Sequence, residues 1–362
     1  MPNYKSRLSK LRKRMNAAGI DALVVFEPHN IFYLCGSNGG FTGAKIGLMV
    51  DANTSTLIID KRYLEEARRT AVADKILAWT VPSYAELVEI AKKLKAKKIG
   101  FEPAYVTVKQ YERLAKDFEG VQLVGVTGLV EPVRETKDAG ELRKIAKAAE
   151  IGDLAFAHIL EFMKPGVAEL DVAIELDFFM RKHGSEKPSF ETIVASGTNS
   201  AVPHATPSNK KIEAGDFVTL DFGAVVDGYH SDVTRTIVVG KARQKQKKIY
   251  GIVKEAQATA LNAVVSGAIC QDLDEIARDI ISDAGYGEAF VHNLGHGVGL
   301  EVHEAPALGK GSETKLKPNM VVTIEPGIYL NGFGGVRIED LVVVTKSGYK
   351  LLTHSTKDLL EL

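Results

Sequence analysis

The sequence predicts an α/β (α+β) fold in two domains, one over residues 1–130 and a larger one over residues 131–362. Three observations lead to this prediction. The 362 residues are enough for two separate cores. In the first third, short β-rich runs alternate with helical periods, which is typical of a sheet whose faces are covered by helices. In the rest of the chain, a pair of helices is followed by β-rich hairpin segments, and this pattern occurs twice.

The first domain begins with an amphipathic helix at Ser6–Ala18, which ends at Gly19. The β-rich runs that follow are Ala22–Phe26, Ile31–Leu34, Ile46–Val50, Thr56–Ile59, Ile76–Trp79, Lys98–Phe101 and Gln122–Val126, with helices expected at Arg62–Ala71, Tyr84–Lys95 and Val108–Asp117. The stretch Gly36–Gly43 lacks the spacing of a phosphate-binding loop and is interpreted as an ordinary loop. Glycine, proline and mixed charges over Thr127–Asp138 indicate the domain boundary.

The second domain begins with a long predicted helix at Ala139–Phe162 and a second helix at Ala168–Lys182. The segment Ile193–Ala205 is then predicted as a strand that ends in a loop carrying His204. A second helix pair is expected at Gln244–Ser266 and Leu273–Ala284, again followed by a loop and strands. The repeated order suggests an internal pseudo-repeat, although the identity between the halves is too low to demonstrate it.

The composition excludes several classes of function. The 46 basic residues balance the 46 acidic ones and form no basic face, so neither nucleic acid nor membrane is expected as a partner. The two cysteines, Cys35 and Cys270, cannot form a disulfide framework and are typical of a reducing compartment. The charged N-terminal stretch resembles no signal peptide, and no apolar stretch approaches the ~20 residues that span a bilayer. We therefore expect a cytoplasmic protein.

The first candidate site segment is Asp216–Gly240, which alternates apolar and polar residues on both sides of Asp227-Gly228. This pair favours a tight hairpin turn. The turn would make Asp221 and Asp232 diagonal neighbours on one face, roughly 7–8 Å apart at Cβ. Two carboxylates among apolar side chains repel each other and lose hydration, which predicts a cation between them. The alternative is two exposed aspartates on a hydrated face.

The second segment, Met320–Thr345, repeats this arrangement with glutamates. Glu325 and Glu339 lie at nearly equal distances from the glycine-rich turn Asn331–Gly335. Three histidines lie between the two segments, at His292, His296 and His303. Carboxylates with one imidazole suit Mn²⁺, Co²⁺, Fe²⁺ or Zn²⁺ better than Ca²⁺. Four carboxylates exceed the needs of one such ion, so two bridged ions are expected.

In order and local context, these segments resemble the metallopeptidase family of aminopeptidase P, prolidase and methionine aminopeptidase. The residues that carry the resemblance are Pro203-His204-Ala205, Asp221, Asp232, His296, His303, Glu325 and Glu339. The resemblance covers Arg134 to Leu362, and the first third is also similar to that of aminopeptidase P and prolidase. It implies an N-terminal creatinase-like α/β domain, a pita-bread catalytic domain and a homodimer.

The resemblance also implies roles for single residues. The expected metal ligands are Asp221, Asp232, His296, Glu325 and Glu339, with Asp232 and Glu339 bridging two divalent ions, Mn²⁺ first and Co²⁺, Zn²⁺ or Fe²⁺ as alternatives. The expected catalytic residues are His204 and His303, which would stabilise charge on the scissile carbonyl oxygen, and Glu325 as proton shuttle. The expected substrate-binding residues are His292, Arg337 and Tyr329. Simpler alternatives are an ion pair for Arg337 and a core position for Tyr329.

The predicted reaction is metal-assisted hydrolysis of the N-terminal peptide bond of short peptides, with proline at the second position implied by the resemblance. We expect a small aminopeptidase-P-like enzyme, because the segments GFTG and Asp60-Lys61-Arg62-Tyr63 resemble those of such proteins and no inserted loop closes the cleft. The main alternative is an Xaa-Pro dipeptidase (prolidase). Creatinase shares the fold but lacks the ligands, and a non-catalytic pita-bread binding protein is a remote alternative.

Overall fold

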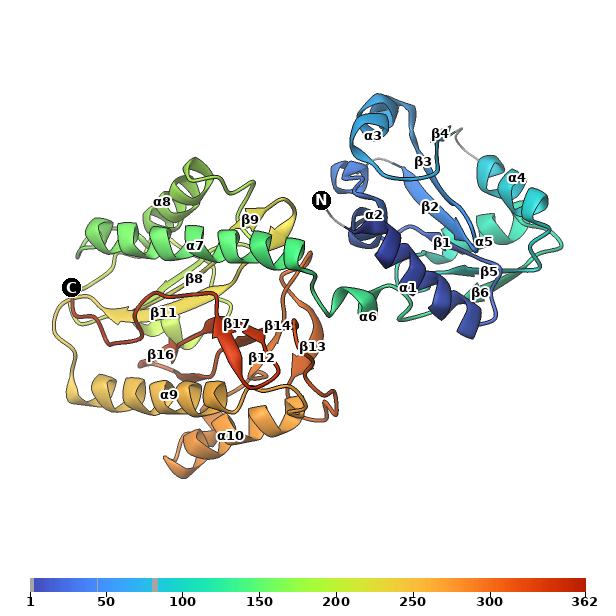
Figure 1. The fold of residues 1–362 in the computed structure, drawn as a ribbon. Helices are drawn as coiled ribbons and strands as arrows, with labels where there is room; N and C mark the ends of the chain where they lie inside the picture. Colours follow the sequence, from blue (N-terminus) through green and yellow to red (C-terminus); the bar gives the residue numbers. More distant parts are fainter. Residues whose placement is uncertain (1–2, 44, 80–83) are drawn as a thin grey trace. The chain divides into compact units, whose positions relative to one another are not determined.

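The structure is a computed structural model that describes residues 3–43, 45–79 and 84–362. The chain divides into two compact units, Met1–Arg134 and Glu135–Leu362 (Figure 1). Among the described residues, none of the helices combines the length and the apolarity that crossing a membrane would require.

The N-terminal unit is built on a six-stranded sheet in the order β4-β3-β2-β1-β5-β6. Its strands are β1 (Ala22–Val25), β2 (Ile46–Asp51), β3 (Ser55–Asp60), β4 (Lys75–Trp79), β5 (Lys98–Phe101) and β6 (Gln122–Gly125). Its helices are α1 (Tyr4–Ala17), α2 (Pro28–Cys35), α3 (Leu64–Thr70), α4 (Ala85–Leu94), α5 (Val108–Asp117) and α6 (Glu131–Arg134), with 3₁₀ turns η1 (Gly39–Thr42) and η2 (Lys61–Tyr63). Strand β1 pairs with β2 antiparallel and with β5 parallel, so the sheet is mixed.

One predicted element of this unit is wrong. The run Ile31–Leu34 lies in helix α2 and not in a strand. Pro28 opens this helix, the Glu27 carboxylate accepts the backbone N–H of Asn30, and Gly36 ends the helix with φ 79°. A four-residue apolar run fits a buried helix as well as a buried strand, and the capping residues decide between them.

The first half of the C-terminal unit packs two helices on a three-stranded sheet in the order β11-β8-β7. Its elements are α7 (Ala139–Phe162), α8 (Glu169–Lys182), β7 (Ile193–Ser196), η3 (Gly197–Ala201), β8 (Phe217–Phe222), β9 (Val225–Val226), β10 (Tyr229–His230) and β11 (Val233–Val238). Their buried side chains form one core that joins, among others, Ile151, Leu176, Val194, Leu220 and Val233.

The second half repeats the order with another helix pair and a five-stranded sheet, β13-β12-β14-β17-β18. Its elements are α9 (Gln244–Asn262), α10 (Cys270–Asp283), η4 (Gly287–Ala289), β12 (Gly295–Gly297), β13 (Glu304–Leu308), β14 (Val321–Ile324), β15 (Gly327–Leu330), β16 (Gly334–Arg337), β17 (Asp340–Val344) and β18 (Tyr349–Leu351). Helices α7 and α8 cover one side of the strands, and α9 and α10 cover the other (Figure 1). This is the expected pita-bread arrangement.

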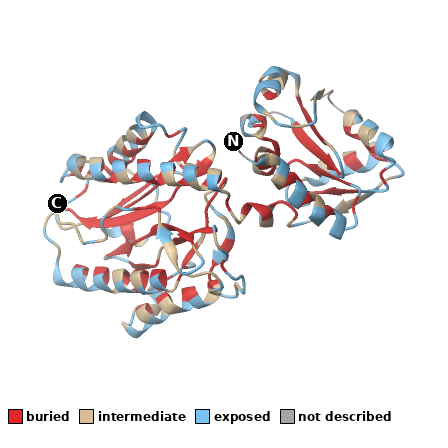
Figure 2. Ribbon diagram, in the orientation of Figure 1, coloured by how far each residue is buried: buried red, intermediate tan, exposed pale blue. Residues whose placement is uncertain are grey.

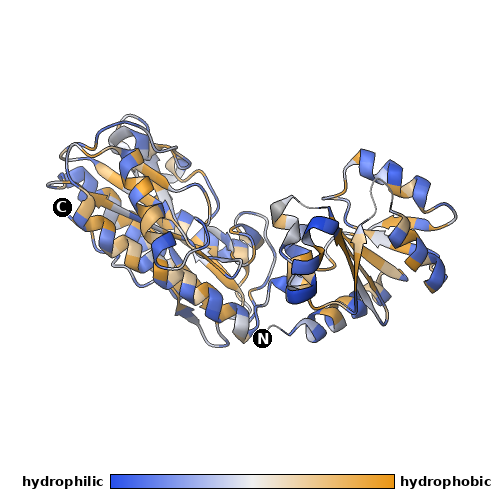
Figure 3. Ribbon diagram, turned by 90° about the horizontal axis from the view of Figure 1, so that it is seen from above, coloured by the Kyte–Doolittle hydropathy of each residue, from blue (hydrophilic) through white to orange (hydrophobic). Residues whose placement is uncertain are grey.

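The burial pattern follows from this layering. Figure 2 shows buried strands between helices whose outer faces are exposed, and Figure 3 shows the same strands as the hydrophobic part of the unit. Against this background, the C-terminal unit buries several charged side chains on its strands and at their ends, among them Asp232, Arg337 and Glu339. Buried charges require partners, which directs attention to this part of the unit.

Candidate metal centre

The first hairpin places its two aspartates as the sequence predicts. Asp227 and Gly228 have φ values of 48° and 77°, which a tight two-residue hairpin turn requires. The pairing Val226↔Tyr229 next to the turn continues in register to Asp221↔Thr234. Asp232 is therefore the diagonal neighbour of Asp221, and the predicted geometry is confirmed.

The second hairpin is interrupted at both glutamates. The pairs Ile324↔Asp340 and Gly327↔Arg337 share one register, which places Glu325 opposite Glu339. Neither glutamate belongs to a strand. The backbone N–H of Glu325 donates to the carbonyl of Leu294 at 2.9 Å, and that of Glu339 donates to the carbonyl of Thr234 at 3.1 Å. The second bond attaches this hairpin to the first and brings both acidic pairs to one cavity.

His296 reaches this cavity from the short strand β12. A Cβ at Gly295 would lie 2.1 Å from the carbonyl oxygen of Thr323, and one at Gly297 would lie 2.3 Å from that of Ala305. Glycine is therefore required on both sides of the histidine. The Nδ1–H of His296 donates to the carbonyl of Gly297 at 3.1 Å, because a carbonyl only accepts. This bond leaves Nε2 as the atom that faces the acids and can bind a metal.

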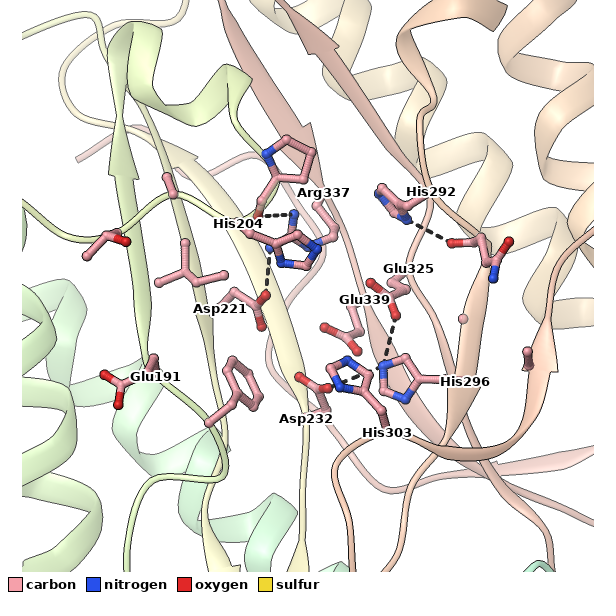
Figure 4. A pocket seen from close by; sticks show the side chains of 18 of the residues that line it. Glu191, His204, Asp221, Asp232, His292, His296, His303, Glu325, Arg337 and Glu339 are labelled. Atoms are coloured by element: carbon pink, nitrogen blue, oxygen red, sulfur yellow. Dashed lines mark hydrogen bonds and ion pairs between the residues drawn. The ribbon is translucent and has the colours of Figure 1, made fainter. Parts of the chain in front are cut away.

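The acids and His296 converge on a cavity of about 510 Å³ (Figure 4). Asp232, His296 and Glu339 each offer a ligand atom within 4.8 Å of the others. Among the described residues, three buried carboxylate oxygens have no hydrogen-bond partner: Oδ1 of Asp221, Oδ1 of Asp232 and Oε1 of Glu339. An unsatisfied buried oxygen is costly, and three of them around one cavity fit a divalent cation.

The pKa shifts have the same origin. Burial, followed by the charges of Glu339, Asp221 and Glu325, raises the pKa of Asp232 well above its usual range. Burial and the charges of Glu325 and Asp221 raise the pKa of Glu339 in the same way. Burial also tends to raise the pKa of Glu325. The hydrogen bond and the charge of His296 outweigh this effect and lower the pKa of Glu325 to about 2. The raised pKa values of Asp232 and Glu339 thus reflect burial and repulsion among the carboxylates, which a bound cation would relieve.

Arg337 lies in the cavity wall beside these acids. Its guanidinium donates to Asp221 Oδ2 at 2.6 Å, to Thr234 Oγ1 at 3.0 Å and to the Tyr329 hydroxyl at 2.7 Å. It also donates to the carbonyl of Pro203 at 3.3 Å. The ion pair that the sequence left as an alternative for Arg337 is therefore present. A role for Arg337 in substrate binding stays a prediction.

Tyr329 lies behind the cavity lining and connects Arg337 to His292. The Nδ1–H of His292 donates to the carbonyl of Asn293 at 2.7 Å, so its Nε2 accepts the hydroxyl proton of Tyr329 at 2.8 Å. Burial lowers the pKa of His292, in agreement with a neutral ring, and raises the pKa of Tyr329 to about 12. This chain of hydrogen bonds fixes the orientation of both rings. Substrate binding by His292 or Tyr329 stays a prediction.

His204 and His303 both line the cavity, from two different loops. His204 is exposed on the irregular segment after η3. His303 packs against His296 with ring centroids 4.3 Å apart, and burial together with the charge of His296 lowers its pKa. The next residue, Glu304, accepts a hydrogen bond from the buried Lys137 at 2.7 Å, which anchors the His303 loop.

Sequence reasoning missed two threonines. Thr234 Oγ1 donates to Glu339 Oε2 at 2.7 Å and accepts from Arg337. Thr323 Oγ1 donates to Glu325 Oε1 at 3.0 Å and accepts the N–H of His296. Thr234 lies two residues after Asp232, and Thr323 lies two residues before Glu325. Strand alternation therefore places each on the face of a candidate ligand, and this signal was available in the sequence.

Comparisons with known proteins identify the family of the chain. The model for "Metallopeptidase family M24" matches residues 143–346, and that for "Creatinase/Prolidase N-terminal domain" matches residues 7–136. An Xaa-Pro dipeptidase of Pyrococcus furiosus is 40% identical over 361 residues, with 98% of this chain and 100% of the relative covered.

Two solved structures are also similar along their whole length. The Xaa-Pro dipeptidase of Bacillus anthracis is 43% identical with a TM-score of 0.95, covering 99% of this chain and 100% of its own. The X-Pro aminopeptidase of Thermotoga maritima is 36% identical with a TM-score of 0.88, covering 96% of this chain and 100% of its own. The chain belongs to metallopeptidase family M24 and carries a creatinase/prolidase N-terminal domain.

Proposed function

We propose that this metallopeptidase is an Xaa-Pro peptidase, which hydrolyses the bond between an N-terminal residue and a following proline. The observation that carries the proposal is the single cavity onto which Asp221, Asp232, His296, Glu325 and Glu339 converge. The names of the relatives that match the whole chain supply the proline specificity.

Between the two forms of this activity, the comparisons favour the dipeptidase. The relative at 40% identity and the solved structure with a TM-score of 0.95 are both named Xaa-Pro dipeptidase. The sequence-based preference for an aminopeptidase agrees with the X-Pro aminopeptidase at 36% identity. We therefore propose Xaa-Pro dipeptides as the main substrates and Xaa-Pro-Yaa tripeptides as slower ones.

The five cavity ligands would hold two divalent ions, with Mn²⁺ favoured and Co²⁺, Zn²⁺ or Fe²⁺ as alternatives. Such ions lower the pKa of water toward ~7 and polarise a carbonyl oxygen. In this proposal Glu325 accepts a proton at its carboxylate and passes it to the leaving nitrogen. His204 and His303 donate hydrogen bonds to the carbonyl oxygen as it gains charge. Arg337 and His292 contribute to the wall against which the substrate lies, and Tyr329 supports both from behind through its hydrogen bonds.

Two further properties belong to the proposal. By its resemblance to aminopeptidase P and prolidase, the protein forms a homodimer, which light scattering on the purified protein would test. A cytoplasmic location is supported by the balanced charge and by the two cysteines, Cys35 and Cys270, which are both free and buried. Fractionation of cells that express the full-length protein would test it.

The proposed activity is tested with three peptides and one chelator. The Mn²⁺-loaded protein is expected to hydrolyse Ala-Pro rapidly and Ala-Pro-Ala more slowly, and to leave Ala-Ala intact. EDTA should abolish both activities, and elemental analysis should find two metal equivalents per chain. Inactivity toward both proline peptides at full metal occupancy would refute the proposal. Faster hydrolysis of Ala-Pro-Ala than of Ala-Pro would show that the enzyme is an aminopeptidase and not a dipeptidase.

A further inference from the structure

The loop that carries His204 is irregular between η3 and β8. It runs from η3 to the segment before β8, and His204 is exposed at its middle. The proposed oxyanion role requires the imidazole to stay within hydrogen-bond reach of one atom of the substrate. The position of His204 therefore depends on how the two ends of its loop are held.

Both ends of this loop are held by one carboxylate. Glu169, the first residue of α8, has no exposed surface. Its Oε1 accepts from the backbone N–H and the hydroxyl of Ser196 at 2.7 and 2.8 Å. Its Oε2 accepts from the hydroxyl and the backbone N–H of Ser208 at 2.7 and 3.3 Å. The amide of Asn199 donates to both oxygens, at 3.0 and 3.1 Å.

The backbone of α8 adds to this attachment. The N–H of Glu169 donates to the carbonyl of Lys210 at 3.1 Å, and the N–H of Leu170 donates to that of Ser208 at 3.0 Å. On the opposite side, Arg337 donates to the carbonyl of Pro203, the residue before His204. The Glu169 carboxylate therefore binds the two ends of the His204 loop, and the Arg337 guanidinium binds its tip.

We propose that Glu169 is a positioning residue for His204, acting through its loop and not on the substrate. Because the cavity lining does not include Glu169, its effect reaches the reaction only through residues 196–208. An ionised carboxylate only accepts hydrogen bonds and has about four lone-pair positions. The side chain of glutamine replaces one acceptor oxygen with a donor, which would face donors here. The inference rests on the proposed role of His204.

The test is a double-mutant cycle of Glu169→Gln and His204→Ala, assayed on Ala-Pro with Mn²⁺. We expect His204→Ala to lower kcat by roughly 10²–10³ and Glu169→Gln to lower it by about tenfold or more. The double variant should be no slower than His204→Ala alone, because the histidine that Glu169 positions is already gone. The KM and the metal content should stay close to the wild-type values in all three variants.

Asp153→Asn is the matched control. Asp153 also holds a loop, since its carboxylate accepts from the N–H of His354 and from the N–H and hydroxyl of Ser355. These residues lie in the C-terminal segment, and the cavity lining includes none of them. If Asp153→Asn lowers kcat, its factor should multiply that of His204→Ala in the double variant, because the two sites act independently. If the effects of Glu169→Gln and His204→Ala also multiply, Glu169 is only structural and the inference is wrong.

Two measurements protect the test against misfolding and against failure of the proposed function. If Glu169→Gln does not fold, Ser208→Ala removes one donor to the carboxylate and should show the same non-additivity with a smaller loss. Hydrogen exchange of peptides covering residues 196–210 should be faster in Glu169→Gln than in the wild type, and unchanged exchange would refute the anchoring. A wild type inactive toward Ala-Pro would refute the proposed function and not this exchange result.

Discussion

The two halves of the C-terminal unit each position a pair of acidic side chains at the cavity, but with different backbone contacts. Each half has a helix pair, a loop with a histidine and a hairpin with two acids. In the first half the register set at the turn is kept, the pairing pauses between Val225↔His230 and Phe222↔Val233, and Asp221 lies inside β8 while Asp232 lies between β10 and β11. In the second half the pairing stops at Glu325 and Glu339, whose backbone N–H groups bond to other segments. One of these bonds, from the N–H of Glu339 to the carbonyl of Thr234, connects the two halves, as do the hydrogen bonds of Arg337 to Asp221 and Pro203.

The loops of the two halves differ in a similar way. The His204 loop is held at its ends by the carboxylate of Glu169, and Lys210, which is paired with Asp216, also donates to the hydroxyl of Ser196. The His292 loop is held by an ion pair on α10, in which Asp274 accepts from Arg278 and from the N–H of Leu294. Arg278 in turn donates to the carbonyls of Phe290 and His292, both at 2.9 Å. The pseudo-repeat therefore preserves the plan of the fold while its polar contacts differ.

The largest expected effect concerns the acid that each half contributes as a proposed bridge between the ions. Asp232→Ala and Glu339→Ala should both abolish hydrolysis, because either change would remove one of the two proposed bridging ligands. The measurement is kcat/KM on Ala-Pro together with elemental analysis. If either variant kept two metals and activity within about tenfold of wild type, ~1.4 kcal/mol in barrier, the ligand assignment for that half would fail.

The next effect compares one histidine from each half. His204→Ala and His303→Ala should retain both metals while kcat falls by roughly 10²–10³, the usual cost of losing an oxyanion donor. Steady-state kinetics and metal analysis on the same samples decide. A lost metal equivalent in either variant would make that histidine a ligand and contradict the proposed division of roles.

A smaller effect is expected from the two threonines. Thr234→Val and Thr323→Val keep the side-chain shape but remove a hydroxyl that bonds to a candidate ligand. Such outer contacts typically change metal affinity or activity by about 10–100-fold. Titration of the metal-free variants with Mn²⁺ measures the affinity directly. Unchanged affinity and kcat in both variants would show that the hydroxyls only fill space.

The sequence predicted much of this site for identifiable reasons. Asp227-Gly228 determines the register of its hairpin, and that register determines which faces Asp221 and Asp232 share. The helical period and a clear stop predicted Ala139–Phe162 at its observed bounds. The strand predicted at Ile31–Leu34 was wrong, because a four-residue apolar run is too short to show whether its hydrophobic period is that of a helix or of a strand.

The partners of Arg337 could not be predicted in the same way. Asp221 and Pro203 lie more than a hundred residues from Arg337 in sequence and in the other half of the unit. The contact depends on how the interrupted second hairpin docks on the first, at Glu339 and Thr234. Local patterns place each residue on a face of its own strand, but only the packed unit shows which faces meet.

The smallest expected effect separates the charge of the acids from their role as ligands. Burial and three neighbouring carboxylates raise the pKa of Asp232 in the metal-free protein. When folding raises the pKa of an acid, the ionised form of that acid destabilises the folded state. At pH 7 the ionised Asp232 therefore lowers the stability of the metal-free protein. This loss of stability disappears as the pH falls through the raised pKa. Asp232→Asn removes the charge at every pH.

Asp232→Asn should therefore raise the Tm of the EDTA-treated protein at pH 7, by roughly 2–4 °C for each kcal/mol regained. With saturating Mn²⁺ the order should reverse, because the wild type gains more from metal binding than the variant. Asp153→Asn serves as the control and should lower the Tm in both conditions, since that carboxylate accepts hydrogen bonds that asparagine only partly replaces. Calorimetry with EDTA and with Mn²⁺ measures all three proteins. A lower Tm for metal-free Asp232→Asn than for the metal-free wild type would mean that the acidic pair is already balanced within the protein, and the argument for a cation at this hairpin would lose its electrostatic basis.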